Sequence, residues 1–590
     1  MKAIIARRKS SIKTNITPSL PNNLHPVLKQ IYLNRNIYTA EDLNKSLQNL
    51  LPHQTLLGIT TATNRIYNAI FDHQKILIIG DFDADGATST AICMKALRLF
   101  GAKNVNFLVP DRFKFGYGLS PEIVTKAKQD YAPDLIITVD NGISSIDGVT
   151  KANSLNIDVV ITDHHLAADT LPPAFAIVNP NQPGDKFESK NLAGVGVIFY
   201  VLLALRIQLR EKQWFKNNNL VEPNLASLLD IVALGTVADV VALDHNNRIL
   251  VDQGLRRIRA GLASPGIKAL IEVSNRDQNT LSASDLGFCL APRLNAAGRL
   301  EDMSIGINCL LSENDSEALV LAKKLNQLNQ ERKSIESQMQ SDALQILKKL
   351  ENNIANQNGI CLYDSTWHQG VIGILASRIK DQYHRPVIVF ANGENGEIKG
   401  SARSINGIHI RDVLDSIASQ HPKLISKFGG HAMAAGLTIM ELDFIRFNEI
   451  FDKEITALLS NKDIDKIIYT DCELAENDYS LELANLLKHV EPWGQAFPEP
   501  KFEGKFHIVD HRIVGEKHLK LKLSMINDSS REIDAIAFNQ VNENNDINFS
   551  HSNEILHAVF KLDINEYNNR KTLQLIIDQF EVTPQSENCM

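Results

Sequence analysis

The sequence predicts an α/β protein built on a doubly wound parallel sheet. From about residue 75, strand-like runs alternate with helical stretches, which is typical of parallel strands joined by helical crossovers. The strands are continuous Ile, Val and Leu runs without polar alternation, as expected where helices cover both faces of a sheet. The expected strands are KILIIG at 75–80, VNFLVP at 105–110, DLIITVD at 134–140 and DVVITD at 158–163, with helices at 88–100 and near 121–129.

Length and composition narrow the class of protein. A chain of 590 residues is too long for one core, and about three domains are expected. The net charge of −8 argues against a protein that coats a polyanion with its whole surface, so nucleic-acid binding would need a local basic groove or bound metals. Six cysteines without a C-x-x-C pair predict neither a disulfide framework nor a zinc knuckle. No signal-peptide pattern and no membrane-length apolar run is present, so a cytoplasmic protein without membrane contact is expected.

The sequence pattern changes twice in the rest of the chain. Residues 315–350 contain neither Gly nor Pro and predict one helix of about 50 Å. Its apolar spacing also fits a coiled-coil dimer, but Arg332 interrupts the seam, and a strut between domains is the preferred interpretation. ICLYD, PVIVF and GVIGILASRIK then predict a second α/β domain. Period-two alternation follows in HLKLKLSMI, EIDAIAF, ILHAVFKLDI and TLQLIIDQF, with a turn at EYNNRK, and predicts an antiparallel sheet or small barrel.

Acidic and histidine side chains follow three of the predicted strands. The run from Asp81 to Gly86, D-x-D-x-D-G, follows the first strand, Asp140 the third and Asp163-His164-His165 the fourth. Because the carboxyl ends of parallel strands converge on one crevice, we expect these side chains to surround a ligand. Crowded carboxylates need positive charge, and oxygen ligands with imidazole suit manganese or magnesium.

Two further acidic features have competing interpretations. D-x-D-x-D-G also begins an EF-hand loop, but no Glu follows at the twelfth position, and the flanks are an apolar strand and helix. Asp239 lies just past a predicted buried helix at 225–238 and either reaches the same crevice or caps the helix at the surface.

Eight motifs in order resemble the DHH phosphoesterase superfamily, and within it the exonucleases specific for single-stranded DNA. One small departure is Phe82, where family members often carry Tyr. The motifs are GDFDADG, ITVDNG, TDHH, GTVADVVAL and APRLNAAGRL between residues 75 and 300, and WHQGVIGILASRI, KGSARS and FGGHAMAAG between 360 and 437.

The resemblance implies a site with two divalent metal ions, Mn²⁺ or Mg²⁺. In such hydrolases one ion lowers the pKa of the attacking water, while both neutralise charge on the phosphate. Asp140 is expected to bridge the ions, with Asp81 adjacent, and His165 to contact the scissile phosphate or protonate the leaving oxygen. An ordinary packed histidine is the alternative for His165. The implied metal ligands are Asp83, Asp85, Asp140, His164 and Asp239.

Substrate contacts are implied in three places. Arg293 and Arg299 are expected near the backbone phosphates by the metals. The second domain is expected to hold the terminal nucleotide through Arg378, Ser401, Arg403, Gly429, Gly430 and His431. The β-rich tail is expected to be an OB-like domain that binds single strands by stacking and charge, although alternating Lys and Leu is also normal for a half-exposed strand. The tail residues considered are Arg512, Lys517, Lys520, Lys522, Phe502, Phe506 and Phe538.

The implied organisation is an N-terminal segment (1–60), a DHH catalytic domain (61–310), a connecting helix (311–355), a DHH-associated domain (356–462) and an OB-like domain (463–590). The implied function is 5′-to-3′ exonucleolytic hydrolysis of single-stranded DNA to 5′-mononucleotides in DNA repair and recombination. The alternatives are a phosphoesterase for short oligoribonucleotides or small nucleotides, which the β-rich tail disfavours, and a non-catalytic single-strand-binding relative, which the complete ligand set disfavours. The expected partners of this monomer are single-stranded DNA, a single-strand-binding protein and a helicase.

Overall fold

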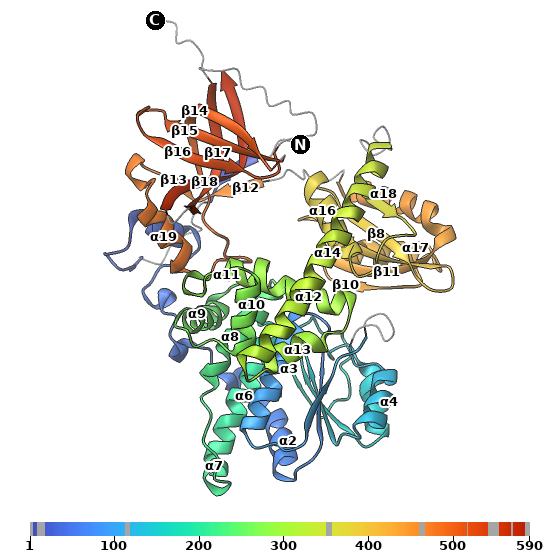
Figure 1. Ribbon diagram of the computed structural model, residues 1–590. Coiled ribbons are helices and arrows are strands. Elements are labelled where there is room, and N and C mark those ends of the chain that lie inside the picture. Colours follow the sequence, from blue (N-terminus) through green and yellow to red (C-terminus); the bar gives the residue numbers. More distant parts are fainter. Residues whose placement is uncertain are drawn as a thin grey trace, which may run out of the picture. The chain divides into compact units, whose positions relative to one another are not determined.

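The computed structural model describes residues 4–8, 18–111, 118–349, 357–459, 467–515, 517–540, 554–567 and 570–584. The chain forms two compact units. The larger unit comprises Ile5–Leu294, Met303–Ala322 and Ile468–Met590, and the smaller comprises Met1–Ile4, Asn295–Asp302 and Lys323–Ile467. Figure 1 shows the elements of each unit.

The larger unit contains the predicted parallel sheet. Its strand order is β3-β2-β4-β5-β6, so the chain runs outward in opposite directions from a switch point between β2 and β4. Ligands of open α/β sheets bind outside the carboxyl ends of the strands at such a point. The four predicted strands are confirmed, and β6 is too short to have been recognised. The strands are β2 (Ile76–Gly80), β3 (Val105–Leu108), β4 (Leu135–Val139), β5 (Asp158–Thr162) and β6 (Ala176–Val178).

Helices cover both faces of this sheet, which explains its continuous apolar strands (Figure 1). On one face, α4 (Pro121–Asp130) and α5 (Ile146–Ser154) bury an apolar core against alternate strand residues such as Ile79 and Ile136. Helices α3 (Ala84–Leu99) and α6 (Gly194–Glu211) pack against each other and against the sheet.

The remaining helices of the larger unit include two single-turn elements. The predicted helix at 225–238 is a 3-10 turn, Leu225–Leu228, followed by α8 (Leu229–Ala238). A π-helix, Leu286–Leu290, separates α11 (Ala283–Asp285) from α12 (Ala291–Leu300). The others are α1 (Pro26–Asn34), α2 (Ile59–Phe71), α7 (Trp214–Asn217), α9 (His245–Arg259), α10 (Pro265–Val273) and α13 (Ser304–Leu311).

The smaller unit confirms the second α/β domain, with a mixed sheet of order β10-β11-β9-β8-β7. The predicted long helix is α14 (Asp315–Lys349), whose Leu325, Leu328 and Met339 are buried within the chain. These residues are therefore not available as the seam of a coiled-coil dimer. The other elements are β7 (Ile360–Tyr363), α16 (Ile372–Tyr383), β8 (Val387–Asn392), β9 (Glu397–Arg403), α17 (Ile410–Gln420), β10 (Lys427–Gly430), β11 (Ala434–Met440) and α18 (Phe444–Leu459).

The C-terminal part of the chain is a closed five-stranded barrel. Its order is β14-β15-β16-β18-β17, closed by pairing of β17 with β14, and β13 extends the sheet beside β14. The four predicted strands are confirmed, whereas β14 was not predicted; residues 568 and 569 of the predicted turn lie outside the described residues. The elements are β13 (Cys472–Glu473), α19 (Leu481–Val490), β14 (Phe502–Val514), β15 (His518–Met525), β16 (Glu532–Ala537), β17 (Glu554–Tyr567) and β18 (Arg570–Pro584), and β1 (Ile4–Arg7) pairs with β12 (Ile467–Thr470).

The barrel corrects one expectation about base stacking. Phe502 and Phe506 are fully buried and contact Phe560 in the barrel core, so neither can stack with a nucleobase. Of the three phenylalanines considered, Phe538 is the exposed one, at 47%, and it contacts His518. Phe502 and Phe506 lie on the face of β14 that forms the inside of the barrel, whereas the expectation of stacking placed them on its outside.

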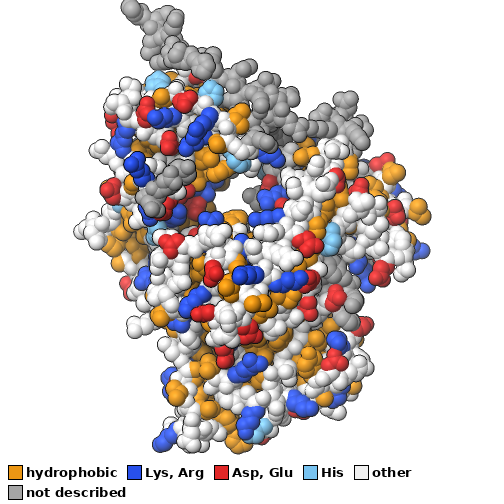
Figure 2. Space-filling model, viewed as in Figure 1, with side chains coloured by type: hydrophobic (Ala, Val, Ile, Leu, Met, Phe, Trp, Pro, Cys, Tyr) orange, Lys and Arg blue, Asp and Glu red, His pale blue; other side chains and the backbone are white. Residues whose placement is uncertain are grey.

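The surface agrees with a protein that does not coat a polyanion. In Figure 2, basic, acidic and apolar side chains are interspersed over the visible face. Among the described helices, no segment is both long and apolar enough to cross a membrane.

Candidate active site

The acidic and histidine residues that follow the strands do converge. Asp81, Asp140 and His164 follow β2, β4 and β5, and Asp239 caps the C-terminal end of α8. Three sets of potential ligand atoms each lie within 4.8 Å of one another: Asp81, Asp83 and Asp140; Asp85, His164 and Asp239; and Asp140, His164 and His165. The structure thus brings together every residue predicted for the metal centre, including Asp239, whose position the sequence left open.

The loop after β2 fixes its acids through backbone amides. Asp83 caps α3, and its Oδ1 accepts hydrogen bonds from the N–H groups of Asp85 at 2.9 Å and Gly86 at 3.0 Å. A Cβ at position 86 would lie 2.5 Å from the Asp81 carbonyl oxygen, so the turn requires Gly86. The acids are therefore held before any ligand arrives.

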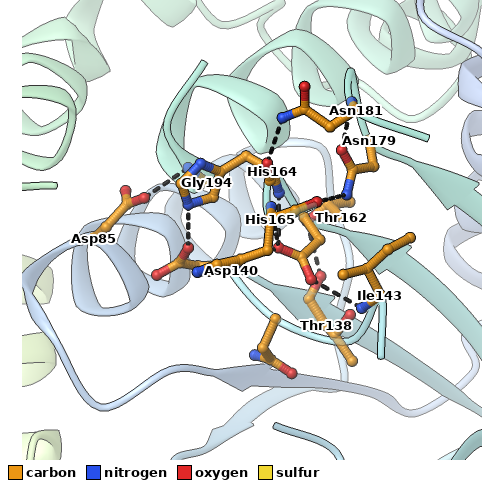
Figure 3. Close-up of polar contacts among 12 residues, drawn as sticks. Asp85, Thr138, Asp140, Ile143, Thr162, His164, His165, Asn179, Asn181 and Gly194 are labelled. Carbon is orange, nitrogen blue, oxygen red and sulfur yellow. Dashed lines mark hydrogen bonds and ion pairs between the residues drawn. The ribbon is translucent and has the colours of Figure 1, made fainter. Parts of the chain in front are cut away.

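Asp85 points across to the start of α6. Its carboxylate accepts hydrogen bonds from the N–H groups of Gly194 at 2.6 Å and Val195 at 2.9 Å, as Figure 3 shows for Gly194. The first N–H groups of a helix have no partner within the helix and favour negative charge. The end of α6 thus compensates part of the charge on this carboxylate.

His164 lies between two of the carboxylates. Its Nε2 is 3.1 Å from Asp140 Oδ1 (Figure 3). The same Nε2 is 3.4 Å from Asp239 Oδ2. Asp140 has a φ of +62°, a left-handed conformation that Asp tolerates better than most residues, and its strand ends there. The chain thus changes direction at Asp140, directly after the end of β4.

Burial and mutual repulsion make the cluster electrostatically unfavourable by itself. Burial, with the charge of Asp83, raises the pKa of Asp85 to about 7. Burial and the neighbouring carboxylates, Asp85 first, also raise the pKa values of Asp140 and Asp239 well above their ordinary range. Carboxylates and one imidazole are the donors that Mn²⁺ and Mg²⁺ accept, and a divalent cation would remove the repulsion. The residues therefore fit the metal ions that the sequence predicts.

His165 differs from His164 because it pairs with a buried acid. Its Nδ1 lies 2.7 Å from Asp163 Oδ1. Burial acts to lower the pKa of His165, but the hydrogen bond and charge of Asp163 outweigh it and raise the pKa to about 9. Burial likewise acts against ionisation of Asp163, and His165 outweighs it, which lowers that pKa to about 2. In the metal-free protein, the pairing with Asp163 thus favours the protonated form of His165, whose Nε2–H is then a potential proton donor.

Several supporting residues were not predicted. Asn179 donates to the His165 carbonyl at 2.9 Å and Asn181 to the His164 carbonyl at 2.6 Å, so both hold the histidine loop (Figure 3). The NPN run at 179–181 follows a strand only three residues long. Because this strand was not recognised in the sequence, the run could not be assigned to the carboxyl edge of the sheet. Gly194 begins an apolar helix, and no polar residue at the start of this helix indicated a role in the site.

Arg293 and Arg299 do not point freely toward a phosphate. Arg293 donates to the carbonyl oxygens of Cys289 and Val273, and burial lowers its pKa. Within the smaller unit, Arg299 Nη1 donates to the Gly370 carbonyl at 3.0 Å, at the turn that precedes α16. Both arginines support local backbone as well as carrying charge.

The smaller unit places part of the predicted nucleotide pocket on adjacent strands. Ser401 of β9 pairs with Gly436 of β11, and Gly429 of β10 pairs with the same residue from the other side. Arg403 Nη1 donates to Ser401 Oγ at 3.0 Å, and burial lowers its pKa.

The other pocket residues extend this row or carry compensated charge. Gly430 follows Gly429 with a φ of +146°, and His431 donates its N–H to the Ala434 carbonyl across the hairpin turn. Arg378 lies on α16 and pairs with Glu336 at 3.0 Å, so its charge is already partly compensated.

The parallel sheet, with its acids and histidines at the carboxyl edge, defines a metal-dependent phosphoesterase of the DHH class. Three family models match successive segments: DHH family, N-terminal domain at residues 75–236, DHHA1 domain at 356–467, and RecJ OB domain at 470–579. The chain belongs to the RecJ family. It is 51% identical to the single-stranded-DNA-specific exonuclease RecJ of Salmonella typhimurium, over 95% of this chain and 97% of that one. The RecJ of Escherichia coli is 50% identical over 98% and 99% of the two chains.

Solved structures agree with the family assignment. The crystal structure of RecJ from Thermus thermophilus in complex with Mn²⁺ matches with a TM-score of 0.77 at 29% identity, covering 95% of this chain and 76% of that one. The Mg²⁺ complex of the same protein matches with a TM-score of 0.71 at 28% identity and covers 95% and 75%. These matches confirm the predicted fold class, including the OB domain.

Proposed function

We propose that this protein is a metal-dependent exonuclease that hydrolyses single-stranded DNA from its 5′ end and releases 5′-mononucleotides in DNA repair and recombination. The observation that carries the proposal is the convergence of Asp81, Asp83, Asp85, Asp140, His164 and Asp239 in a protein of the RecJ family. The protein uses two divalent ions, manganese or magnesium. When bound, these ions activate the attacking water and neutralise charge on the phosphate.

The side chains of the centre divide the remaining work. Asp140, which like His164 lies in two of the three ligand sets, would contact both ions, and Asp83, Asp85, His164 and Asp239 would supply further ligands. Asp81 lies beside Asp140 in one of these sets. Asp163 keeps His165 protonated, so His165 donates to the scissile phosphate and delivers a proton to the leaving oxygen.

The phosphate contacts come from the arginines and the hairpin of the smaller unit. Arg403, held by Ser401, and Arg378 offer planar guanidinium groups to the terminal phosphate. Gly429 has open space where a side chain would lie, so backbone at this hairpin is accessible to a ligand, with Gly430 and His431 following it. Arg293 and Arg299 remain candidates for further contacts with the DNA backbone, besides their hydrogen bonds to local carbonyl oxygens.

Cell location and partners follow from the activity. We expect a cytoplasmic monomer that acts on strands opened by a helicase and covered by a single-strand-binding protein. The domain boundaries proposed from the sequence, 61–310, 356–462 and 463–590, assign catalysis to the first, terminal-nucleotide binding to the second and strand binding to the third.

The test is digestion of DNA labelled at either end, in Mn²⁺, with duplex DNA and a short oligoribonucleotide in parallel. The proposal predicts immediate release of the 5′ label as mononucleotide from single strands, with the 3′ label released last. Asp140→Asn should lose at least about 10²- to 10³-fold in kcat on all substrates. Activity confined to the oligoribonucleotide would instead identify a small-substrate phosphoesterase, and early loss of the 3′ label would overturn the proposed direction.

A further inference from the structure

We propose that the π-helix Leu286–Leu290 is a stacking platform for the bases of single-stranded DNA beside the metal centre, with Phe288 as the contact residue. The inference rests on the proposed function, because it takes single-stranded DNA as the substrate of that centre. A π-helix is a rare widening of a helix and is frequently found at functional sites. Here it interrupts a helical stretch that otherwise runs from Ala283 to Leu300.

Phe288 is presented to solvent by a firmly anchored turn. Its side chain is 83% exposed, more than any other described Phe, Tyr or Trp. Leu286 and Leu290 in the same turn are fully buried. Leaving a phenylalanine in water forgoes the stabilisation that burial of an aromatic side chain provides. The turn is therefore fixed by its leucines and holds an aromatic ring outward.

The platform lies against the helix that carries a metal ligand. Gly287 packs on α8 so closely that a Cβ there would lie 3.2 Å from Val237 Cγ1, two residues before Asp239. Val240, directly after Asp239, is 63% exposed and has a φ of +61°, which is strained for a β-branched residue. Such strain persists where surrounding structure enforces it and is common at functional sites. Two exposed apolar side chains thus belong to segments that adjoin Asp239: Val240 follows it directly, and the turn of Phe288 packs on the helix before it.

Two arginines contact the turn through Cys289. Arg276 Nε donates to Cys289 Sγ at 3.2 Å and also lies 3.4 Å from Asp285, while Arg293 donates to the Cys289 carbonyl. Proteins bind single strands by combining stacked aromatic rings with nearby cations. The charges of Arg276 and Arg293 beside an exposed ring therefore favour a nucleic acid over an apolar protein surface.

A cavity lies between Arg276 and residues of the barrel domain. Arg276 lines a cavity of about 330 Å³ whose other walls include Lys488 and Lys561. These lysines are paired with Asp563 at 3.3 Å and Glu499 at 2.7 Å, so the cavity is polar rather than strongly cationic. Within the larger unit, Arg276 and Asp285 thus contribute both to the surroundings of the π-helix and to a polar cavity that residues of the barrel domain also line.

The experiment compares Phe288→Ala, Phe288→Leu and Phe288→Trp with a matched control, Phe71→Ala, which removes a 58% exposed phenylalanine from α2. Kinetics of mononucleotide release give KM and kcat. Binding is measured by the fluorescence of 2-aminopurine, which stacking quenches, at successive positions of a single strand, with Asp140→Asn added to each variant to prevent hydrolysis.

Loss of stacking should raise KM for Phe288→Ala by about five- to a hundredfold, with a much smaller change in kcat. Quenching at one or two positions should disappear in Phe288→Ala and Phe288→Leu, return in Phe288→Trp, and persist in Phe71→Ala. Unchanged KM and quenching in an active Phe288→Ala enzyme would overturn the platform alone. A change in oligomeric state with unchanged DNA binding would overturn it too, by identifying a second copy as the occupant. An inactive wild-type enzyme would instead refute the proposed function.

Discussion

At the residue scale, the site depends on a few side chains whose charges oppose one another. The carboxylates of Asp85, Asp140 and Asp239 repel each other when ionised, and only part of that charge is met by backbone N–H groups. A metal-binding role and a structural role for these acids therefore predict opposite effects of neutralising one of them.

Asp140→Asn should reduce kcat by about 10²- to 10³-fold or more, because electrostatic stabilisation of the transition state is lost. In chelator-treated protein, the same variant should be at least as stable as wild type, since the substitution removes a repelled charge without changing shape. Thermal denaturation in EDTA, with activity assayed in Mn²⁺, measures both effects. Clear destabilisation of the variant in EDTA would assign Asp140 a structural role instead.

Asp163→Asn tests the assignment of His165 as the acid. Asp163 raises the pKa of His165 to about 9, so protonated His165 persists up to that pH and is lost above it. Without the carboxylate, the largest contribution that raises the pKa of His165 is lost, so the alkaline decline of kcat should move to lower pH.

Because Asp163 also accepts hydrogen bonds from the N–H groups of Ile143 and His164, the variant's folding is checked by circular dichroism. A folded variant whose kcat falls equally at every pH, with the decline unmoved, would contradict proton donation by His165.

At the element scale, α1 and the segment around Lys45 connect the barrel domain to the rest of the larger unit. Tyr32 donates to Glu491 at 3.0 Å and Lys45 to the same carboxylate at 2.8 Å, while Arg248 of α9 lies 3.7 Å away. Glu491 lies just past α19 and its side chain is fully buried. The local sequence does not predict these contacts, because each partner lies more than 200 residues from Glu491 in the chain.

Glu491→Ala should therefore lower the free energy of unfolding by about 3–5 kcal/mol, because it leaves Lys45 and Arg248 buried without their partner. The matched control is Lys522→Ala, which removes an exposed pair with Glu532 and should cost at most about 1 kcal/mol. Urea denaturation followed by circular dichroism measures both. Equal small losses would show that this joint contributes little to stability.

The elements that the sequence predicted well have local causes. Apolar runs such as 76–80 and 135–139 are strands because helices bury both faces, and long uninterrupted periodicity gave the helix at 315–349. Strand β14 was missed because Gly504 and several charged residues weaken its alternation. The inward direction of Phe502 and Phe506 depends on closure of the barrel by β17, which alternation alone does not encode.

At the scale of the whole molecule, the convergence of the acids and His164 could be predicted because parallel strands bring their carboxyl ends together whatever lies between them. The arginines were harder to place. Arg293 stabilises the π-helix and Arg378 pairs with Glu336, contacts that depend on packing between distant segments.

The whole protein should depend on metal ions more strongly as the pH rises. The pKa of Asp85 is about 7 in the folded, metal-free protein, above its ordinary value near 3.8, so the stability it contributes falls as pH rises between those values. A metal ion reverses this penalty and competes with fewer protons at higher pH. Mg²⁺ should thus raise Tm more at pH 8 than at pH 6, measured by differential scanning calorimetry. An equal or larger rise of Tm at pH 6 would contradict the inference that the ionised carboxylates repel one another in the absence of metal.

The most direct test of the central claim is anomalous scattering from crystals grown with Mn²⁺. The account predicts two strong manganese peaks among Asp81, Asp83, Asp85, Asp140, His164 and Asp239, with Asp140 contacting both ions and both peaks weakened in Asp140→Asn. Manganese bound elsewhere, or no manganese at these side chains in crystals of an active enzyme, would contradict it.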